Sequence, residues 1–157
     1  MAEILIVYFS KSGNTKEMAE YVKQGVQAAD VSVKLMDVKD AEPDDLLIPA
    51  GIIIGSPTYY GLPSAEILKL FDDSVKYHGG LEGKVGGAFS SSANIGGGNE
   101  TTIMAILEAM LIHGMIIQGT SEGDHYGPVS IGAPDDRAKK QCIALGKRVA
   151  ELTKKLK

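Results

Sequence analysis

Apolar residues along the chain alternate between short continuous runs and longer stretches with helical spacing. Residues 4–9 and 51–54 are apolar on both faces, residues 31–38 alternate, and two further apolar segments span residues 85–90 and 115–119. Short runs that are apolar on both faces are typical of strands in a parallel sheet covered on both sides. The sequence therefore predicts five strands.

Helical spacing fills the intervals between these strands. It occurs in residues 15–28, 64–77, 99–113 and 134–156, and in a shorter segment, residues 41–47. Alternating strands and helices predict an α/β fold, a doubly wound five-stranded parallel sheet in a three-layer sandwich. The simplest strand order is 2-1-3-4-5, and residues 1–157 are expected to form a single domain.

Three unusual loops are expected to meet at one edge of this sheet. In such folds the ligand lies outside the carboxyl ends of the strands, next to the first and third strands. The loop after the first strand holds Ser10, Ser12, Gly13, Asn14 and Thr15. The loop after the third strand holds Pro57, Thr58, Tyr59, Tyr60 and Gly61. The loop after the fourth strand holds Ser91, Ser92, Ala93, Asn94 and Gly97.

The first of these loops has the composition of a phosphate-binding site. Free backbone N–H groups and the positive end of a helix dipole attract an anion, and hydroxyls can donate to its oxygens. The alternative is that the same side chains are ordinary N-caps, although one cap needs only one acceptor. The sequence contains neither G-x-G-x-x-G after the first strand nor G-x-x-x-x-G-K-[ST], which argues against a dinucleotide or ATP at this loop.

The other two loops suit a flat ligand with a polar edge. Tyr59 and Tyr60 lie between two prolines and could flank a ring, and the glycine-rich third loop lets backbone groups approach a ligand closely. The alternatives are tyrosines that only pack and a glycine run that only links two elements. A phospho-receiver domain is excluded, because it needs acidic residues where this chain has Tyr8-Phe9-Ser10 and Gly55-Ser56.

Composition narrows the remaining function classes. The net charge of −4 argues against nucleic-acid binding, and no metal-ligand motif is present. No apolar stretch approaches 18 residues, and the chain runs from Met1 into the first strand without a signal-like segment, so a cytoplasmic protein without membrane contact is expected. The single cysteine, Cys142, falls in a helical pattern and is expected to be buried and unreactive.

The motif Ser10-x-Ser12-Gly13-Asn14-Thr15 resembles the phosphate loop of flavodoxin-like proteins. Residues 55–61, 89–93, 96–102 and 113–117 are more narrowly similar to WrbA-type NAD(P)H:quinone oxidoreductases, as is Tyr126-Gly127-Pro128 apart from His125, where that branch has proline. The resemblance implies that the first loop holds the FMN phosphate, the second lines the isoalloxazine, and the third lines its pyrimidine edge and ribityl chain. It also implies that His113 approaches the ring, whereas the residues alone favour a helix C-terminal histidine.

The resulting prediction is an FMN-binding oxidoreductase that passes two electrons from NAD(P)H to a quinone or a similar acceptor. No catalytic acid or base is expected, because the flavin carries the redox chemistry. One alternative is a flavodoxin-type one-electron carrier that docks redox proteins, and another is an interaction module without turnover. The WrbA-type insertions after the second and fifth strands are missing, so the resemblance leaves homo-oligomer formation open.

Overall fold

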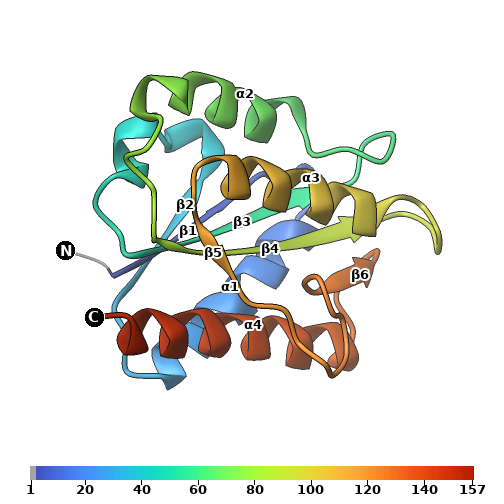
Figure 1. Ribbon diagram of the computed structural model, residues 1–157. Coiled ribbons are helices and arrows are strands. Elements are labelled where there is room, and N and C mark those ends of the chain that lie inside the picture. The colour runs from blue at the N-terminus through green and yellow to red at the C-terminus, as the bar shows by residue number, and fades with distance from the viewer. Residues whose placement is uncertain (1–2) are drawn as a thin grey trace.

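A parallel sheet forms the middle layer of the protein, and helices cover both of its faces (Figure 1). This computed structural model describes residues 3–157. The strands are β1 (Ile4–Tyr8), β2 (Val33–Asp37), β3 (Gly51–Pro57), β4 (Val85–Ser92), β5 (Ile116–Ile117) and β6 (Val129–Ile131). The helices are α1 (Asn14–Ala28), α2 (Ala65–Asp73), α3 (Asn99–Ile112) and α4 (Asp136–Lys155), with 3₁₀ turns η1 (Val38–Asp40), η2 (Pro43–Leu46) and η3 (Ser74–Tyr77).

The sheet has the predicted order, β2-β1-β3-β4-β5, and its neighbouring strands are parallel. Helices α1 and α4 lie on one face, and α2 and α3 lie on the other (Figure 1). This arrangement confirms the three-layer sandwich. None of the helices within residues 3–157 has the length and apolar character needed to cross a membrane.

Alternating residues of the central strands supply two separate hydrophobic layers. On β1, Ile4 and Ile6 pack with the residues beneath α1 and α4, whereas Leu5 and Val7 pack with those beneath α2 and α3. All four side chains are almost completely buried. A strand that is buried on both faces needs apolar residues at every position, which explains the unbroken apolar run in the sequence.

The edge of the sheet beyond β4 differs from the prediction. The sequence predicts one fifth strand, whereas the structure divides this position between β5, which pairs with the start of β4, and β6, which pairs with its end. Both short strands run parallel to β4, and residues 118–128 connect them. The sequence does not predict β6, because its three residues include only one fully buried side chain, the polar Ser130.

Two predicted helices also differ from the observed elements. Residues 41–47 contain the 3₁₀ turn η2 rather than an α-helix, and Pro43 occupies its first position, where the missing N–H is tolerated. Residues 64–77 form α2 followed by η3. The Ser74 hydroxyl donates a 2.7 Å hydrogen bond to the Phe71 carbonyl oxygen, at the point where the α-helix becomes a 3₁₀ turn.

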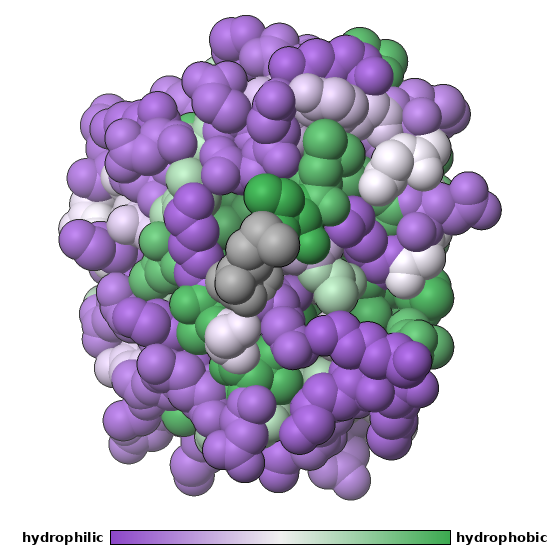
Figure 2. Space-filling model, turned by 90° about the vertical axis from the view of Figure 1, so that its left-hand side faces the viewer, coloured by the Kyte–Doolittle hydropathy of each residue, from purple (hydrophilic) through white to green (hydrophobic). Residues whose placement is uncertain are grey.

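The exterior is mostly hydrophilic. Figure 2 shows the side of the molecule on which both termini lie, and hydrophilic residues cover most of this face, with hydrophobic residues gathered near its centre. Exposed apolar residues are normal for globular proteins, because polar atoms do not suffice to cover the whole surface.

Cys142 is fully buried on α4, as the sequence predicts. Burial raises the pKa of its thiol to about 12. Because the thiolate is the reactive form, we expect native protein at pH 8 to resist alkylation by iodoacetamide, and protein unfolded in guanidinium to react completely. Mass spectrometry after a timed exposure measures the difference, and rapid labelling of native protein would contradict the prediction.

Candidate functional site

The three predicted loops meet in one pocket of about 590 Å³ at the carboxyl ends of β1, β3 and β4. This volume lies within the range of about 300 to 1,000 Å³ that is typical of small-molecule sites. Its lining comes from all three loops and from the turn after β6: Lys11, Ser12, Asn14, Thr15, Pro57, Thr58, Tyr59, Ser91, Ser92, Ala93 and Gly132. The fold therefore brings together residues that are far apart in the sequence.

The start of α1 is open toward an external acceptor. Gly13 occupies the N-cap position with φ of +100°, a conformation that favours glycine, and within residues 3–157 no side chain caps this helix. The Ser10 hydroxyl instead accepts a 3.1 Å hydrogen bond from the Gly13 N–H, inside the loop itself. The first N–H groups of α1 are therefore available to an anion.

Two other helices show what ordinary capping looks like in this chain. Ser64 caps α2 by accepting a hydrogen bond from the Ile67 N–H, and Asp135 caps α4 by accepting one from the Ala138 N–H. The hydroxyls of the first loop do not cap α1 in this way. Helix α3 also starts at an uncapped glycine, Gly98, so it is the open start of α1 together with the hydroxyls of Ser12 and Thr15 in the pocket lining that favours the anion-site interpretation.

Hydrogen bonds join the three loops behind the pocket. Thr15 is 1% exposed, and its hydroxyl shares a 2.9 Å hydrogen bond with the Ser91 hydroxyl. The Thr58 N–H donates a 2.8 Å bond to the Ser91 carbonyl oxygen, and the Thr58 and Ser90 hydroxyls share a 3.0 Å bond. The pocket wall is therefore organised by the chain's own contacts before any ligand binds.

The second loop forms a tight turn over residues 59–62. Tyr59 and Leu62 exchange two backbone hydrogen bonds, of 2.9 and 3.1 Å. The turn is held against the start of α3, because the Thr101 hydroxyl donates a 2.7 Å bond to the Gly61 carbonyl oxygen. A Cβ on Gly98 would lie 2.6 Å from the Gly61 Cα, so the two loops pack backbone to backbone.

The two tyrosines of this turn have different surroundings. Tyr59 lines the pocket with its ring edge-on to Phe9, at a centroid separation of 6.3 Å. Desolvation, and to a lesser extent the charge of Glu66, raise the pKa of its phenol. Tyr60 has a φ of +51° and is fully exposed, so it does not simply pack on the core.

Some predicted residues shape the loops without lining the pocket. These are Ser10, Gly13, Tyr60, Gly61, Asn94 and Gly97. Conversely, Lys11 and Gly132 line the pocket although the sequence analysis does not name them as site residues. The charge of Lys11 inside an anion loop is a signal that could have identified it. Gly132, whose N–H donates a 2.8 Å bond to the Ser92 carbonyl oxygen, follows the unpredicted strand β6 and carried no such signal.

His113 is not part of this pocket. It follows α3, which starts at the carboxyl end of β4 and runs back across the sheet to the strands' amino ends. There the Gly83 N–H donates a 3.0 Å bond to the Gly114 carbonyl oxygen, and Ile116 pairs with Val85, the first residue of β4. Within a single chain, the length of α3 therefore separates His113 from the three loops.

The fold and the site together define a flavodoxin-like α/β protein, with a pocket at the β1–β3 switch point beside an open helix N-terminus. The chain belongs to the flavodoxin family, whose pattern matches residues 6–107. Membership implies that FMN is the group bound, and the open start of α1 beside Ser12 and Thr15 fits its terminal phosphate.

Similar proteins include both flavodoxins and NAD(P)H dehydrogenases (quinone). A flavodoxin of Aquifex aeolicus is 38% identical, with 96% of this chain and 86% of the relative aligned. An NAD(P)H dehydrogenase (quinone) of Archaeoglobus fulgidus is 33% identical, with 99% and 100% aligned. Among solved structures, a WrbA-like flavodoxin from Agrobacterium tumefaciens superposes with a TM-score of 0.84 at 28% identity over the full length of both chains.

Proposed function

We propose that this protein is an FMN-dependent oxidoreductase that transfers two electrons from NAD(P)H to a quinone or a similar acceptor. The observation that carries the proposal is the uncapped start of α1, which opens onto a pocket lined by Ser12 and Thr15. A phosphate monoester is the ligand group that best matches free N–H groups, hydroxyls and the nearby Lys11 ammonium.

In this proposal the residues of the chain bind and orient the cofactor. The first turn of α1, Ser12 and Thr15 hold the phosphate, and Tyr59 lies against the ring. The backbone of residues 91–94 faces the polar edge of the ring, and Ser10, Gly13 and the residues 60–61 turn set the shape of the loops. When bound, FMN supplies the reversible two-electron chemistry, so the protein needs no acid–base pair.

The third loop supports turnover of small molecules. Residues 93–98 contain no aromatic side chain, and most of this loop is exposed. A ring without an aromatic cover on this side stays accessible to a nicotinamide and then to a quinone. The A. fulgidus relative, whose name states this activity, aligns over its whole length.

The second candidate is a one-electron carrier that docks protein partners. The fully exposed Tyr60, at the tip of the turn beside the pocket, favours it, because exposed aromatic residues are common contacts between proteins. The A. aeolicus relative, named a flavodoxin, is consistent with this second function.

FMN is expected to bind far more tightly than riboflavin, and more tightly than FAD. Riboflavin lacks the phosphate that the start of α1 is proposed to hold, and FAD carries a diphosphate joined to a nucleotide. Fluorescence titration of the apoprotein with the three flavins measures the difference. Equal affinities for FMN and riboflavin would rule out the phosphate site.

Direct oxidation of NADH or NADPH separates the two candidates. We expect the FMN-loaded protein to oxidise at least one of them with benzoquinone as the acceptor, and to be reduced in a single two-electron step during a stepwise reductive titration. Absorbance at 340 nm and the flavin spectrum provide the two readouts. Two resolved one-electron steps together with no nicotinamide oxidation would establish the carrier instead.

A further inference from the structure

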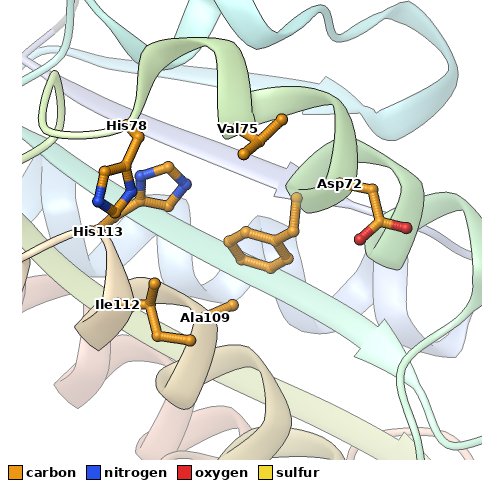
Figure 3. Close-up of a pocket in the computed structure, with 7 residues that line it drawn as sticks. Asp72, Val75, His78, Ala109, Ile112 and His113 are labelled. Atoms are coloured by element: carbon orange, nitrogen blue, oxygen red, sulfur yellow. The ribbon is translucent and has the colours of Figure 1, made fainter.

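A second pocket, of about 380 Å³, lies on the α2 and α3 side of the sheet and contains two histidines from different elements (Figure 3). His78 follows η3 and His113 follows α3. Their ring centroids are 6.2 Å apart, and the ring planes are inclined by 42°. This pocket shares no lining residue with the proposed FMN site.

The hydrogen bonds of His113 determine which ring nitrogen carries its proton. Its Nε2 lies 2.8 Å from the Ser74 Oγ, and the Ser74 hydroxyl proton is already donated to the Phe71 carbonyl oxygen at 2.7 Å. The Nε2–H of His113 must therefore donate to Ser74, which leaves a lone pair on Nδ1. A flipped ring would place carbon against Ser74 and lose this bond.

The Nδ1 atom of His113 is an unused acceptor. The side chain is 93% buried, since 7% of it is exposed, and within residues 3–157 Nδ1 has no hydrogen-bond partner. Burial and the neighbouring His78 lower the pKa of the imidazole, so near neutral pH the ring is neutral and keeps its lone pair. A buried acceptor without a partner is unfavourable unless something occupies it.

We propose that His78 and His113 are the two protein ligands of a binding site for a divalent transition-metal ion of the Zn²⁺ class. Neutral imidazole nitrogens suit such ions, and a ligating histidine typically donates its other N–H to a fixed partner, as His113 donates to Ser74. Figure 3 shows the two rings adjacent, with the Asp72 carboxylate further along the same pocket.

The observed spacing is close to what such an ion requires. Two imidazoles on one tetrahedral Zn²⁺, with Zn–N distances of about 2.0 to 2.1 Å, place their ring centroids roughly 5 Å apart. His78 therefore has to approach by about 1 Å, and its side chain is exposed and followed by Gly79 and Gly80. Among residues 3–157 no third metal-ligating side chain joins the pair, so water completes the coordination.

Titration of tag-free, FMN-loaded, EDTA-treated protein with ZnCl₂ tests the site. We expect one Zn²⁺ per chain by isothermal titration calorimetry, and an affinity at least tenfold lower in His78→Ala. The chain offers a matched control, His125→Ala, because His125 already uses Nδ1 in a 2.9 Å contact with the Thr120 carbonyl oxygen and does not line this pocket. Mg²⁺ and Ca²⁺, which prefer oxygen ligands, should not bind at the same concentrations.

A second readout leaves His113 in place, because this side chain is buried and its substitution would also disturb the fold. In ¹⁵N spectra of the imidazoles, Zn²⁺ should shift the His113 Nδ1 and one His78 nitrogen and leave His125 unchanged. The proposal fails if His78→Ala retains the full affinity, if His125→Ala loses as much as His78→Ala, or if the His113 Nδ1 signal does not move.

Discussion

The Ser12→Ala protein is expected to bind FMN about ten- to a hundredfold more weakly than the unmodified protein. Ser12 is exposed and lines the pocket beside the uncapped start of α1, so its hydroxyl is free to donate to a phosphate oxygen. A hydrogen bond to a charged group contributes about 1.5 to 3 kcal/mol, which corresponds to this change in affinity. Fluorescence titration of the apoprotein measures it.

Riboflavin and a distant serine provide the controls for this variant. Since riboflavin lacks the phosphate, Ser12→Ala should leave riboflavin affinity unchanged, and Ser121→Ala, outside the pocket, should alter neither ligand. Thr15→Ala should weaken FMN binding by a similar factor and also lower thermal stability, because Thr15 additionally bonds Ser91. An equal loss of FMN and riboflavin affinity in Ser12→Ala would show that Ser12 acts on the loop rather than on the phosphate.

The Gly146→Ala protein is expected to be less stable than the unmodified protein by about 3 kcal/mol. A Cβ on Gly146 of α4 would lie 2.0 Å from the Val22 carbonyl oxygen of α1. In the same way, a Cβ on Gly25 of α1 would lie 2.0 Å from the Ile143 carbonyl oxygen of α4. The obstacle is a helix backbone, so relief requires the two helices to separate.

This expected loss of stability is opposite in sign to the usual effect of replacing glycine by alanine in a helix. In a helix interior, alanine in place of glycine normally stabilises by about 0.5 to 1 kcal/mol. The matched control is Ala144→Gly at an exposed position of the same helix, which should cost about 1 kcal/mol through backbone entropy alone. Urea unfolding followed by circular dichroism measures both variants, and a Gly146→Ala protein as stable as the original would contradict the close approach of α1 and α4.

The covered parallel sheet could be predicted from the sequence because each central strand is buried on both faces, and its order was then the simplest one for a doubly wound fold. The segment Ile4 to Val7 packs against a helix layer on each side of the sheet, so all of its side chains are apolar. This apolar run can be recognised in the sequence without knowing which residues pack against it. The strand β6 could not be predicted in the same way. Its pairing with β4 depends on backbone hydrogen bonds, and the alternation of Val129, Ser130 and Ile131 is too short to predict a strand.

The candidate site, like the sheet, could be predicted only in part from the sequence. Composition alone pointed to the first loop, since hydroxyls and glycine at a strand-to-helix junction are the chemistry that an anion needs. It did not distinguish a cap from an anion site, because both use the same side chains. The structure adds the position of Ser10, whose hydroxyl bonds the loop at Gly13 instead of capping the first turn of α1, and this position favours the anion-site interpretation.

The alternation of strands and helices, and the loops that carry polar residues, could be predicted from the amino-acid sequence because they follow from local side-chain properties. Which distant residues meet depends on the tertiary structure. Gly132 lines the proposed FMN pocket, whereas His113 lies away from that pocket, beside His78. Such neighbours depend on helix length and chain path, which no local pattern of residues contains.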